Sequence, residues 1–384
     1  MVVYRVSSNG IRKAKRYDKL YTTMKNLAYL LALHSIDGLG NVRLKNLLDF
    51  YQDPKLAWRG NRQDWQKLSI PKQVISLWQE QLKTFDPESY LQEILGSGVM
   101  VLTWLDSDYP PLLKEIYDPP LIIYYKGEVS LFKLPAMAVV GTRQITSYGK
   151  LVTERIVKSL VQAGLVVVSG LARGVDTTAH QAALLSQGKT IAVLGAGLNN
   201  IYPAENRQLS EKIIASGGLV ICEHPPSYAV TPGVFPARNR IISGLSLGVV
   251  ITEAAIDSGS LITARAALDQ GREVFAVPGQ ITSSLAEGPL SLIKQGAKLV
   301  TSGEDILDEL GIEQSQVARV QRQESINLSE LEQRVLQALE TEQKHIDEIC
   351  RMLKLTSAEV AGSLVKMEIK GLVKNMGGGV YLKL

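Results

Sequence analysis

The segment Phe-Pro-Ala-Arg-Asn-Arg-Ile-Ile-Ser-Gly, residues 235–244, places two arginines and an asparagine where a loop enters a predicted buried helix. Guanidinium and amide groups at such a point favour an anionic ligand, because they donate several directed hydrogen bonds. Four short aliphatic runs precede this segment and two follow it, and the first three runs are each followed at once by glycine. The runs are residues 136–140, 165–169, 190–194, 219–222, 247–251 and 273–277.

These runs alternate with helical patterns of about ten to fifteen residues, which is the signature of repeated strand-helix-strand units. The alternation predicts an α/β fold with a Rossmann-like, doubly wound and mostly parallel sheet. Between residues 99 and 126, two further β-type runs lie among closely spaced prolines, and they predict additional strands at one edge of this sheet. Ligands of such sheets bind beyond the carboxyl ends of the strands, so the residues after each run are the candidates for a site.

Arginines, glycines and small polar residues follow the predicted strands. Arginine beside glycine-rich backbone can hold phosphate through forked hydrogen bonds. Residues 136–310 contain equal numbers of basic and acidic side chains, so the arginines form a local concentration of charge. We therefore predict a nucleic-acid-binding site formed by Gly141, Thr142, Arg143, Gly170, Arg173, Asn206, Arg207, Arg238, Asn239, Arg240, Ser258, Gly259 and Ser260.

Two of these arginines also have structural alternatives. Arg143 is expected to contact phosphate, and its alternative is a salt bridge to Glu253 or Glu223. Arg173 lies in a similar loop, where Asp176 is close enough in sequence to neutralise it. Both interpretations of Arg173 remain open from the sequence.

The helical register gives expectations for other polar residues. Arg238 and Arg240 are two residues apart and so point in different directions on a helix. We expect Arg238 to meet the ligand and Arg240 to brace the fold. Asp176 is expected to be a helix N-cap, and His180 lies on an alanine-rich face that favours packing over catalysis.

Helical patterns flank the central region on both sides. The predicted organisation is a basic flexible tail (1–26), a SAM-like or helix-hairpin-helix domain (27–95), an extended Rossmann-like domain (96–312), a linker (313–327) and a winged helix (328–384). In the helical domain, Gly38 and Gly40 form either a DNA-contacting hairpin or a plain helical turn. The tail is either a solvated extension or an accessory phosphate-contacting arm. Three helices, the first turn of the third capped by Thr356, and a glycine-rich hairpin predict the winged helix.

Composition excludes several classes of protein. The formal net charge is only +4, and two cysteines and four histidines are scattered, so neither a disulfide framework nor a metal site is predicted. The chain has no apolar run of transmembrane length and no signal-like start, and we expect a cytoplasmic protein. Gly195-Ala-Gly197 lacks the third glycine of a dinucleotide fingerprint, so no NAD and no other cofactor is predicted, and no catalytic set can be assembled.

Several motifs in this chain resemble those of the DprA/Smf family, the DNA-processing proteins of natural transformation, and the resemblance covers most of the chain. The resemblance implies single-stranded DNA binding without sequence specificity, a homodimer formed through the Rossmann-like domain, protection of incoming DNA and help in loading the RecA recombinase. Leu290 and Ser291 replace polar residues that are usual in the family, which puts one contact at the pocket floor in doubt. The motifs are Tyr109-Pro110, Asp118-Pro-Pro120, Gly141-Thr-Arg143, Ser169 to Asp176 with Ala179-His180, Tyr202-Pro203 with Asn206, Phe235-Pro236 with Arg238-Asn-Arg240, Ser258-Gly-Ser260 and Val277-Pro-Gly279.

Two other functions compete with this interpretation. A related group of enzymes with the same core cleaves the N-glycosidic bond of nucleoside monophosphates, and Glu253 is the residue that could act there, although its surroundings lack that group's glycine-rich loop. Alternatively, the winged helix could make the chain a transcription factor. Residues 327–384 carry equal numbers of basic and acidic side chains, which argues against tight major-groove binding.

Overall fold

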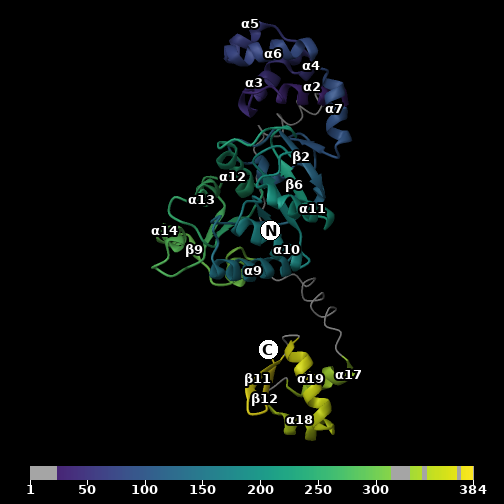
Figure 1. Ribbon diagram of the computed structural model, residues 1–384, viewed down its shortest axis with the longest axis vertical. Coiled ribbons are helices and arrows are strands. Elements are labelled where there is room, and N and C mark those ends of the chain that lie inside the picture. Colours follow the sequence, from purple (N-terminus) through teal and green to yellow (C-terminus); the bar gives the residue numbers. More distant parts are fainter. Residues whose placement is uncertain (1–23, 313–328, 340–343, 370–372, 384) are drawn as a thin grey trace. The chain divides into compact units, whose positions relative to one another are not determined.

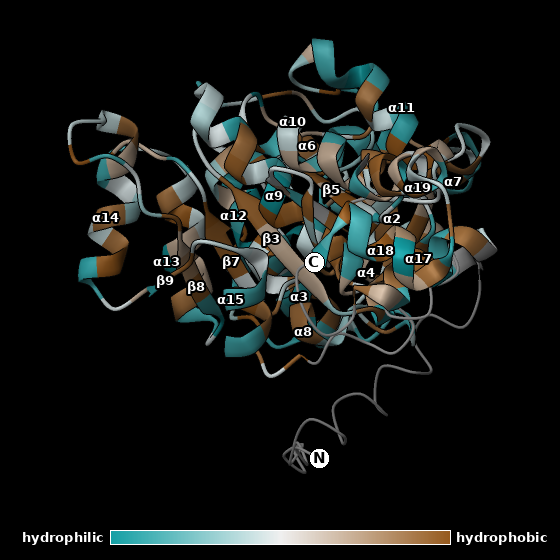
Figure 2. Cartoon of the chain, turned by 90° about the horizontal axis from the view of Figure 1, so that it is seen from below, coloured by the Kyte–Doolittle hydropathy of each residue, from teal (hydrophilic) through white to brown (hydrophobic). Residues whose placement is uncertain are grey.

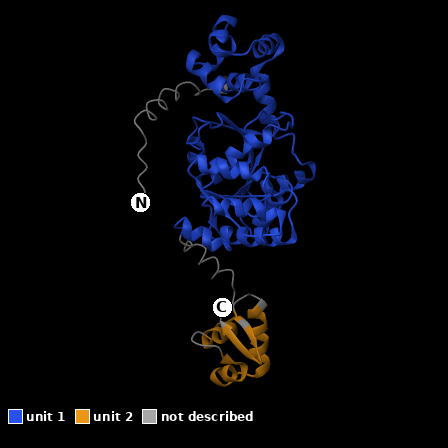
Figure 3. Ribbon diagram, turned by 90° about the vertical axis from the view of Figure 1, so that its left-hand side faces the viewer, with its two compact units in different colours: residues 1–313 blue, residues 314–384 orange. Residues whose placement is uncertain are grey.

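The computed structural model describes residues 24–312, 329–339, 344–369 and 373–383. By internal contacts the chain forms two compact units, residues 1–313 and 314–384 (Figure 3). The predicted linker and nearly all of the predicted basic tail lie outside the described residues. In the described part of the chain, no helix is long and apolar enough to cross a membrane.

The first unit begins with short helices that surround a tryptophan-rich core. The rings of Trp65 and Trp78 stack at 3.9 Å between centroids, and both side chains are buried. Asp53 and Asp86 accept hydrogen bonds from the first-turn backbone N–H groups of helices α4 and α7, each of which has proline in its first turn. The helices are α2 (Met24–His34), α3 (Asn41–Tyr51), α4 (Pro54–Trp58), α5 (Arg62–Lys67), α6 (Lys72–Thr84) and α7 (Pro87–Gly96).

The centre of the first unit is a sheet of nine described strands in the order β1-β2-β6-β5-β4-β3-β7-β8-β9. β1 and β2 are antiparallel additions at one edge, as the proline-rich region predicts, and the neighbours from β6 to β9 are parallel. The chain runs outward from β3 to β6 and then returns to place β7 on the other side of β3, so the switch point lies between β3 and β7. The strands are β1 (Met100–Thr103), β2 (Ile122–Gly127), β3 (Ala136–Val140), β4 (Val166–Ser169), β5 (Thr190–Leu194), β6 (Leu219–Cys222), β7 (Gly248–Ile251), β8 (Glu273–Ala276) and β9 (Lys298–Leu299).

Helices cover both faces of this sheet (Figure 1). Alternate side chains of each strand point to opposite faces, and both sets are aliphatic, which explains the unbroken hydrophobic runs. One face packs against α9 (Ser147–Gln162), α10 (Val175–Leu185), α11 (Arg207–Ala215) and α15 (Gly303–Glu309). The other packs against α8 (Pro111–Lys114), α12 (Val234–Gly244), α13 (Ser260–Asp269) and α14 (Glu287–Lys294). Short 3₁₀ segments are η1 (Val129–Lys133), η2 (Ala204–Asn206) and η3 (Ser284–Ala286).

The N-terminal helices share one hydrophobic core with the β2, β5 and β6 region of the sheet. His34 of α2 and the buried hydroxyl of Tyr124 on β2 are hydrogen-bonded at 3.1 Å. At the glycine turn, Gly38 has a positive φ of 82° and Gly40 is the N-cap of α3. The next residue, Asn41, donates to Glu223 after β6 at 3.3 Å, so the hairpin of the helical part is fastened to the sheet.

The second unit is the predicted winged helix. It contains α17 (Glu330–Ala338), α18 (Ile346–Leu353) and α19 (Ser357–Ile369), followed by the hairpin β11 (Val373–Gly377) and β12 (Val380–Lys383). The expected cap is present, because the Thr356 hydroxyl accepts from the Glu359 backbone N–H at 3.4 Å. A third strand was not expected: β10 (Lys344–His345) pairs with β12.

Candidate nucleic-acid interface

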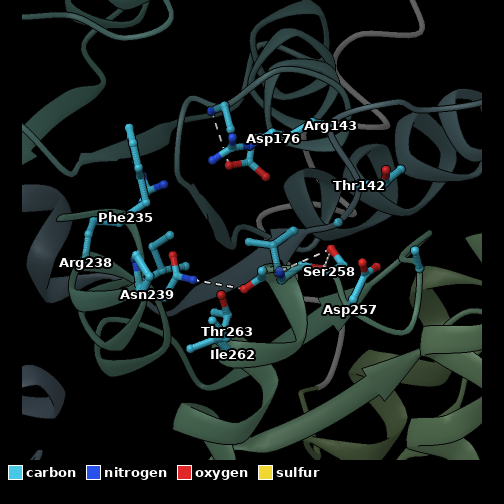
Figure 4. A pocket seen from close by; sticks show the side chains of 18 of the residues that line it. Thr142, Arg143, Asp176, Phe235, Arg238, Asn239, Asp257, Ser258, Ile262 and Thr263 are labelled. Carbon is cyan, nitrogen blue, oxygen red and sulfur yellow. Dashed lines mark hydrogen bonds between the residues drawn. The ribbon is translucent and has the colours of Figure 1, made fainter. Parts of the chain in front are cut away.

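An open cavity of about 800 Å³ lies at the switch point of the sheet. Its walls come from the loop after β3, the loop before α12 with the first turns of that helix, and the segment after β7 that starts α13. Figure 4 shows Phe235, Arg238 and Asn239 of α12 on one side of the cavity, and Thr142, Asp257 and Ser258 on the other. These chain segments meet because the carboxyl ends of parallel strands share one edge of the sheet.

Helix α12 contributes the buried part of the wall. Arg238 is only 5% exposed, and its Nη1 donates to the carbonyl oxygen of Gly170 at 2.5 Å and also to that of Val193. Burial lowers the pKa of Arg238 to about 10, the positive charge of Arg143 acts in the same direction, and Asp176 opposes it. Arg238 therefore ties α12 to the ends of β4 and β5 while it lines the cavity.

The Asp176 carboxylate organises the loop beneath Arg238. It accepts from the backbone N–H groups of Gly170 at 3.1 Å and Ala172 at 3.3 Å. Burial raises the pKa of Asp176, whereas Arg238 and these backbone groups lower it. The expectation that Asp176 is an N-cap is wrong: Gly174 occupies the cap of α10 with a φ of 72°, a conformation that disfavours side chains with a Cβ.

Arg143 has a different environment. Its side chain is exposed, and among the described residues it forms no ion pair, so the expected alternative of a bridge to Glu253 or Glu223 is wrong. The guanidinium lies 5.4 Å from the centroid of the Phe235 ring. Tyr202 is the next ring, 5.5 Å from Phe235. A cation and two aromatic rings thus lie together on the rim of the cavity.

The amino end of α13 faces the cavity from the β7 side. Ser258, Gly259 and Ser260 line it, and the hydroxyls of the two serines are hydrogen-bonded at 2.8 Å. Asn239 of α12 donates to the Gly259 carbonyl at 3.1 Å and fixes this end of the helix. The positive end of the helix dipole therefore points to the same space as Arg143. Gly141 and Thr142 complete the wall on the β3 side.

The other predicted site residues lie outside the main cavity. Arg173 pairs with Glu205 at 2.5 Å rather than with Asp176, and it borders a small adjoining hollow with Gly170. The buried Asn206 amide donates to the Leu171 carbonyl at 2.8 Å, so it holds a loop in place. Arg207 is exposed at the start of α11 and lines neither space.

Arg240 points away from the cavity, as the helical register predicts. Its guanidinium makes a two-pronged contact with the buried carboxylate of Glu223, at 3.0 and 2.6 Å, and lies 3.4 Å from Asp118. The opposite charge of Glu223 raises the pKa of Arg240 against the effect of burial. Arg240 therefore braces the junction between α12, β6 and the proline-rich segment.

Glu253 and His180 both form hydrogen bonds within the fold. The Glu253 carboxylate accepts from the backbone N–H of Thr146 at 2.9 Å and from its hydroxyl at 2.6 Å, just ahead of α9. It lines a separate cavity of about 460 Å³ with Pro278 and Gly279, not the main one. His180 is buried and hydrogen-bonded to Thr190 at 2.7 Å, which confirms packing. Among the described residues, no group of His, Cys, Asp and Glu is placed to hold a metal ion.

The departure at Leu290 and Ser291 does not affect the cavity floor. Both residues belong to α14, and neither lines the main cavity. Ser291 instead accepts from the side chain of Gln295 at 3.0 Å. The residue just before α14 that does line the main cavity is Leu285 of η3.

The sequence alone assigned no role to Tyr202 and Phe235, although both belong to the quoted motifs. Aromatic residues beside glycines and arginines in the segments that follow the strands are the signal that could have identified them. Asp257 also lines the cavity and was not expected there. The Tyr202–Phe235 pairing brings together residues from the loop after β5 and from α12, and it depends on the fold.

Comparison with known proteins gives a consistent result. Residues 100–311 match the family described as DNA recombination-mediator protein A, and residues 320–379 match the DprA winged helix domain. Protein Smf of Synechocystis is 35% identical over 92% of this chain and 98% of its own length. The X-ray structure of DNA processing protein A from Streptococcus pneumoniae has a TM-score of 0.64 at 39% identity, covering 73% of this chain and 97% of that one.

A second similar structure has a description that mentions a ligand. DNA processing protein A of Helicobacter pylori, described for its single-stranded DNA binding mode, has a TM-score of 0.50 at 31% identity. The match covers 55% of this chain and 95% of that one. From the family match across the sheet and the winged helix, and from similarity to relatives over nearly the whole length, the chain belongs to the DprA/Smf family of DNA-processing proteins.

Proposed function

We propose that this protein binds single-stranded DNA at the main cavity, with little sequence preference and without catalysis. The observation that carries the proposal is Arg143, an exposed guanidinium with no ion pair to a described residue, set against Phe235 at the mouth of the cavity. A phosphate would complete its hydrogen bonds, and the α13 amino end would add a second favourable dipole.

The aromatic pair favours a single strand over a duplex. The exposed Tyr202 ring and the partly exposed Phe235 ring offer faces on which unpaired bases can stack, whereas bases in a duplex have their faces covered. Stacking also tolerates any base, so it fits binding without sequence preference. The single-stranded DNA named for the Helicobacter pylori relative supports this choice.

The test is a titration of labelled oligothymidylate and of a mixed-sequence strand at two salt concentrations. We expect similar affinities for the two strands and a steep loss with salt, because bound arginines displace counterions. Arg143→Ala should lower affinity about ten- to a hundredfold, since it removes charge-assisted hydrogen bonds worth roughly 1.5–3 kcal/mol.

Arg155→Ala is the matched control, because Arg155 is an exposed arginine of α9 that lines neither the main cavity nor its neighbour. It removes the same charge and should leave affinity nearly unchanged. A flat salt dependence, a preference for duplex, or equal losses in the two variants would contradict the proposal.

We further propose that the protein protects incoming DNA and helps load RecA during natural transformation. Family membership supports this role. On a strand covered by a single-strand-binding protein, the chain should shorten the delay before RecA hydrolyses ATP, and Arg143→Ala should not. An unchanged delay with wild-type protein would leave DNA binding standing and remove the RecA role.

A homodimer formed through the Rossmann-like region is also proposed. Apolar side chains remain exposed near the β9 edge of the sheet: Ile262 at 40%, Leu268 at 57%, Ile281 at 88% and Leu299 at 46%. Figure 2 shows brown, hydrophobic stretches of ribbon in this region, around α13, α14 and β8. Leu261 of α13 is buried within the protomer and is not available for this contact. Light scattering at micromolar protein should give a dimer that Leu268→Asp weakens. A monomer for the wild-type protein would contradict this assembly.

A further inference from the structure

A second cationic site lies where the N-terminal helices meet the sheet. The ammonium groups of Lys45 on α3 and Lys114 on α8 each lie 5.3 Å from the centroid of the Trp104 ring. The two lysines come from separate parts of the fold, yet they converge on one partly buried indole. The Trp104 backbone N–H donates to the Leu121 carbonyl at 2.9 Å, which holds the main chain of this residue directly after β1.

No carboxylate of a described residue pairs with either lysine. The neighbouring acids are engaged elsewhere: Asp106 accepts from the backbone N–H and hydroxyl of Thr103, Asp108 pairs with Lys133, and Glu115 lies 3.9 Å from Arg272. Two ammonium groups therefore lie beside one ring, and no described carboxylate neutralises them. Together they produce a local positive potential. Such a potential attracts an anion.

The cationic site lies at the same edge of the sheet as the main cavity. Thr103, just before Trp104, pairs with Ile122 at the start of β2, and Tyr124 of β2 pairs with Cys222 at the end of β6. From β6 the edge continues through the ends of β5 and β4 to β3. Five steps of about 4.8 Å separate β1 from β3, so the two sites are on the order of 20 Å apart.

The charged groups between the two sites are held in place by ion pairs, and two carboxylates with one guanidinium leave one net negative charge there. Glu223 follows β6, and Arg240 neutralises it and lies 3.4 Å from Asp118. Asn41, in the first turn of the helix that carries Lys45, also binds Glu223. The lysine site and the cavity are therefore parts of one rigid edge, over which a polyanion can pass.

We propose that Lys45 and Lys114, held by Trp104, form a second phosphate-contact site for the single strand that enters the main cavity. This inference rests on the proposed DNA-binding function and extends its footprint toward the N-terminal helices. The two ammonium groups make the contact, so we expect the site to bind phosphates without sequence preference. A span of about 20 Å suits a single-strand site of several nucleotides.

The test compares strand lengths in a double variant of the full chain, Lys45→Ala with Lys114→Ala. With oligothymidylate of about twenty nucleotides, we expect affinity to fall roughly three- to tenfold at low salt. The slope of log K against log salt should become shallower by about 1.4, because two phosphate contacts of a single strand are lost. With about six nucleotides, which the main cavity can hold alone, affinity should stay within about twofold.

The matched control is Lys67→Ala with Lys83→Ala, two exposed lysines of the same helical part that pair with Asp64 and Glu80. It removes the same formal charge and should leave the slope unchanged. Lys45→Arg with Lys114→Arg should restore binding, and an unchanged unfolding midpoint would show that each variant folds.

Three results would overturn the inference. The double variant could match the control on the long strand, or it could lose equal affinity on both lengths, which would indicate a disturbed main cavity or a general field effect. Failure of the charge-preserving arginine variant to restore the salt slope would also count against phosphate contact. Wild-type protein that binds neither length would instead refute the proposed function itself.

Discussion

The arginines around the cavity differ in how deeply their side chains are buried, and this difference determines what each can contact. The Nη1 group of Arg238 donates to two backbone carbonyls, and the side chain is almost inaccessible. Arg143 is exposed, lies beside the Phe235 ring and forms no ion pair with a described residue. A buried guanidinium must be compensated within the protein, because leaving it unpaired costs several kcal/mol. Arg238 is therefore part of the scaffold as well as the wall, and Arg143 is the better test of ligand contact.

Gly170 is required by the guanidinium that lies over it. A Cβ at this position would overlap the Arg238 side chain, which is held on the other side by the strand ends. Gly170→Ala should lower the free energy of unfolding by on the order of 2–4 kcal/mol, because a buried ion would lose its geometry. Chemical denaturation measures this change.

Gly259→Ala gives the comparison, since nothing lies within 4 Å of a Cβ built there and its φ is negative. Its stability should remain close to that of the wild type. Equal losses in the two variants would show that the Arg238 contact is not the cause.

His180 should make stability fall as the medium becomes acidic. Burial lowers its pKa to about 3, and the Arg238 charge acts in the same direction. In the unfolded chain its pKa is about 6.5, so between these values the unfolded state binds the extra proton and stability rises with pH. At pH 5 the loss relative to pH 7 is on the order of 2 kcal/mol from this group.

His180→Asn can retain a hydrogen bond to Thr190 and cannot titrate in this range. Urea unfolding at pH 7 and pH 5 should therefore show a smaller pH dependence in the variant than in the wild type. The same difference between the two pH values in both proteins would contradict the assignment.

At the scale of elements, the ends of helices are fixed by groups from distant strands. Helix α9 begins beside the end of β7. Its N-cap residue, Thr146, donates from its backbone N–H and from its hydroxyl to the Glu253 carboxylate, which follows β7. Gly149 allows this approach, since a Cβ on it would overlap the Glu253 carboxylate. A carboxylate that binds a helix cap in this way is a structural group, and it lies outside the cavity that carries Arg143.

Glu253→Gln tests binding against catalysis. The amide keeps one acceptor for the Thr146 N–H, and the Thr146 hydroxyl can turn to accept from it, so the stability loss should be about 1 kcal/mol. DNA affinity should hold or rise slightly, because a negative charge is removed without loss of a phosphate donor.

Wild-type protein incubated with purine and pyrimidine nucleoside monophosphates should release no free base above background. Release that disappears in Glu253→Gln would favour the N-glycosidic enzyme over the binding protein. Chromatography of the reaction mixture distinguishes the two outcomes.

The whole molecule consists of two compact units, and all residues of the main cavity belong to the first. Removing residues after 313 should leave cooperative unfolding and single-strand affinity within about threefold, because the winged helix carries balanced charge. Binding and unfolding of the 1–313 fragment measure this. A large loss of affinity, with an altered salt slope, would show that the winged helix contacts DNA.

The sequence by itself determined the α/β core, the order of its strands along the chain and the winged helix. Each predicted core strand agrees with the structure within about a residue at its ends, because an aliphatic run covered on both faces is a local signal. The glycines and arginines after the strands also predicted the edge of the sheet at which the main cavity lies, since all parallel strands end there. The direction of Arg240 away from Arg238 followed from helical periodicity alone.

Only the tertiary structure decided which of those arginines are free. Arg240 meets Glu223, Arg173 meets Glu205, and Arg238 meets the Gly170 carbonyl 68 residues away. The same applies to Asn206, to the Arg143–Phe235–Tyr202 cluster and to the lysines around Trp104. The local sequence pattern does not predict which distant residue a charged or aromatic side chain will contact. Those contacts depend on which strand ends the sheet brings together.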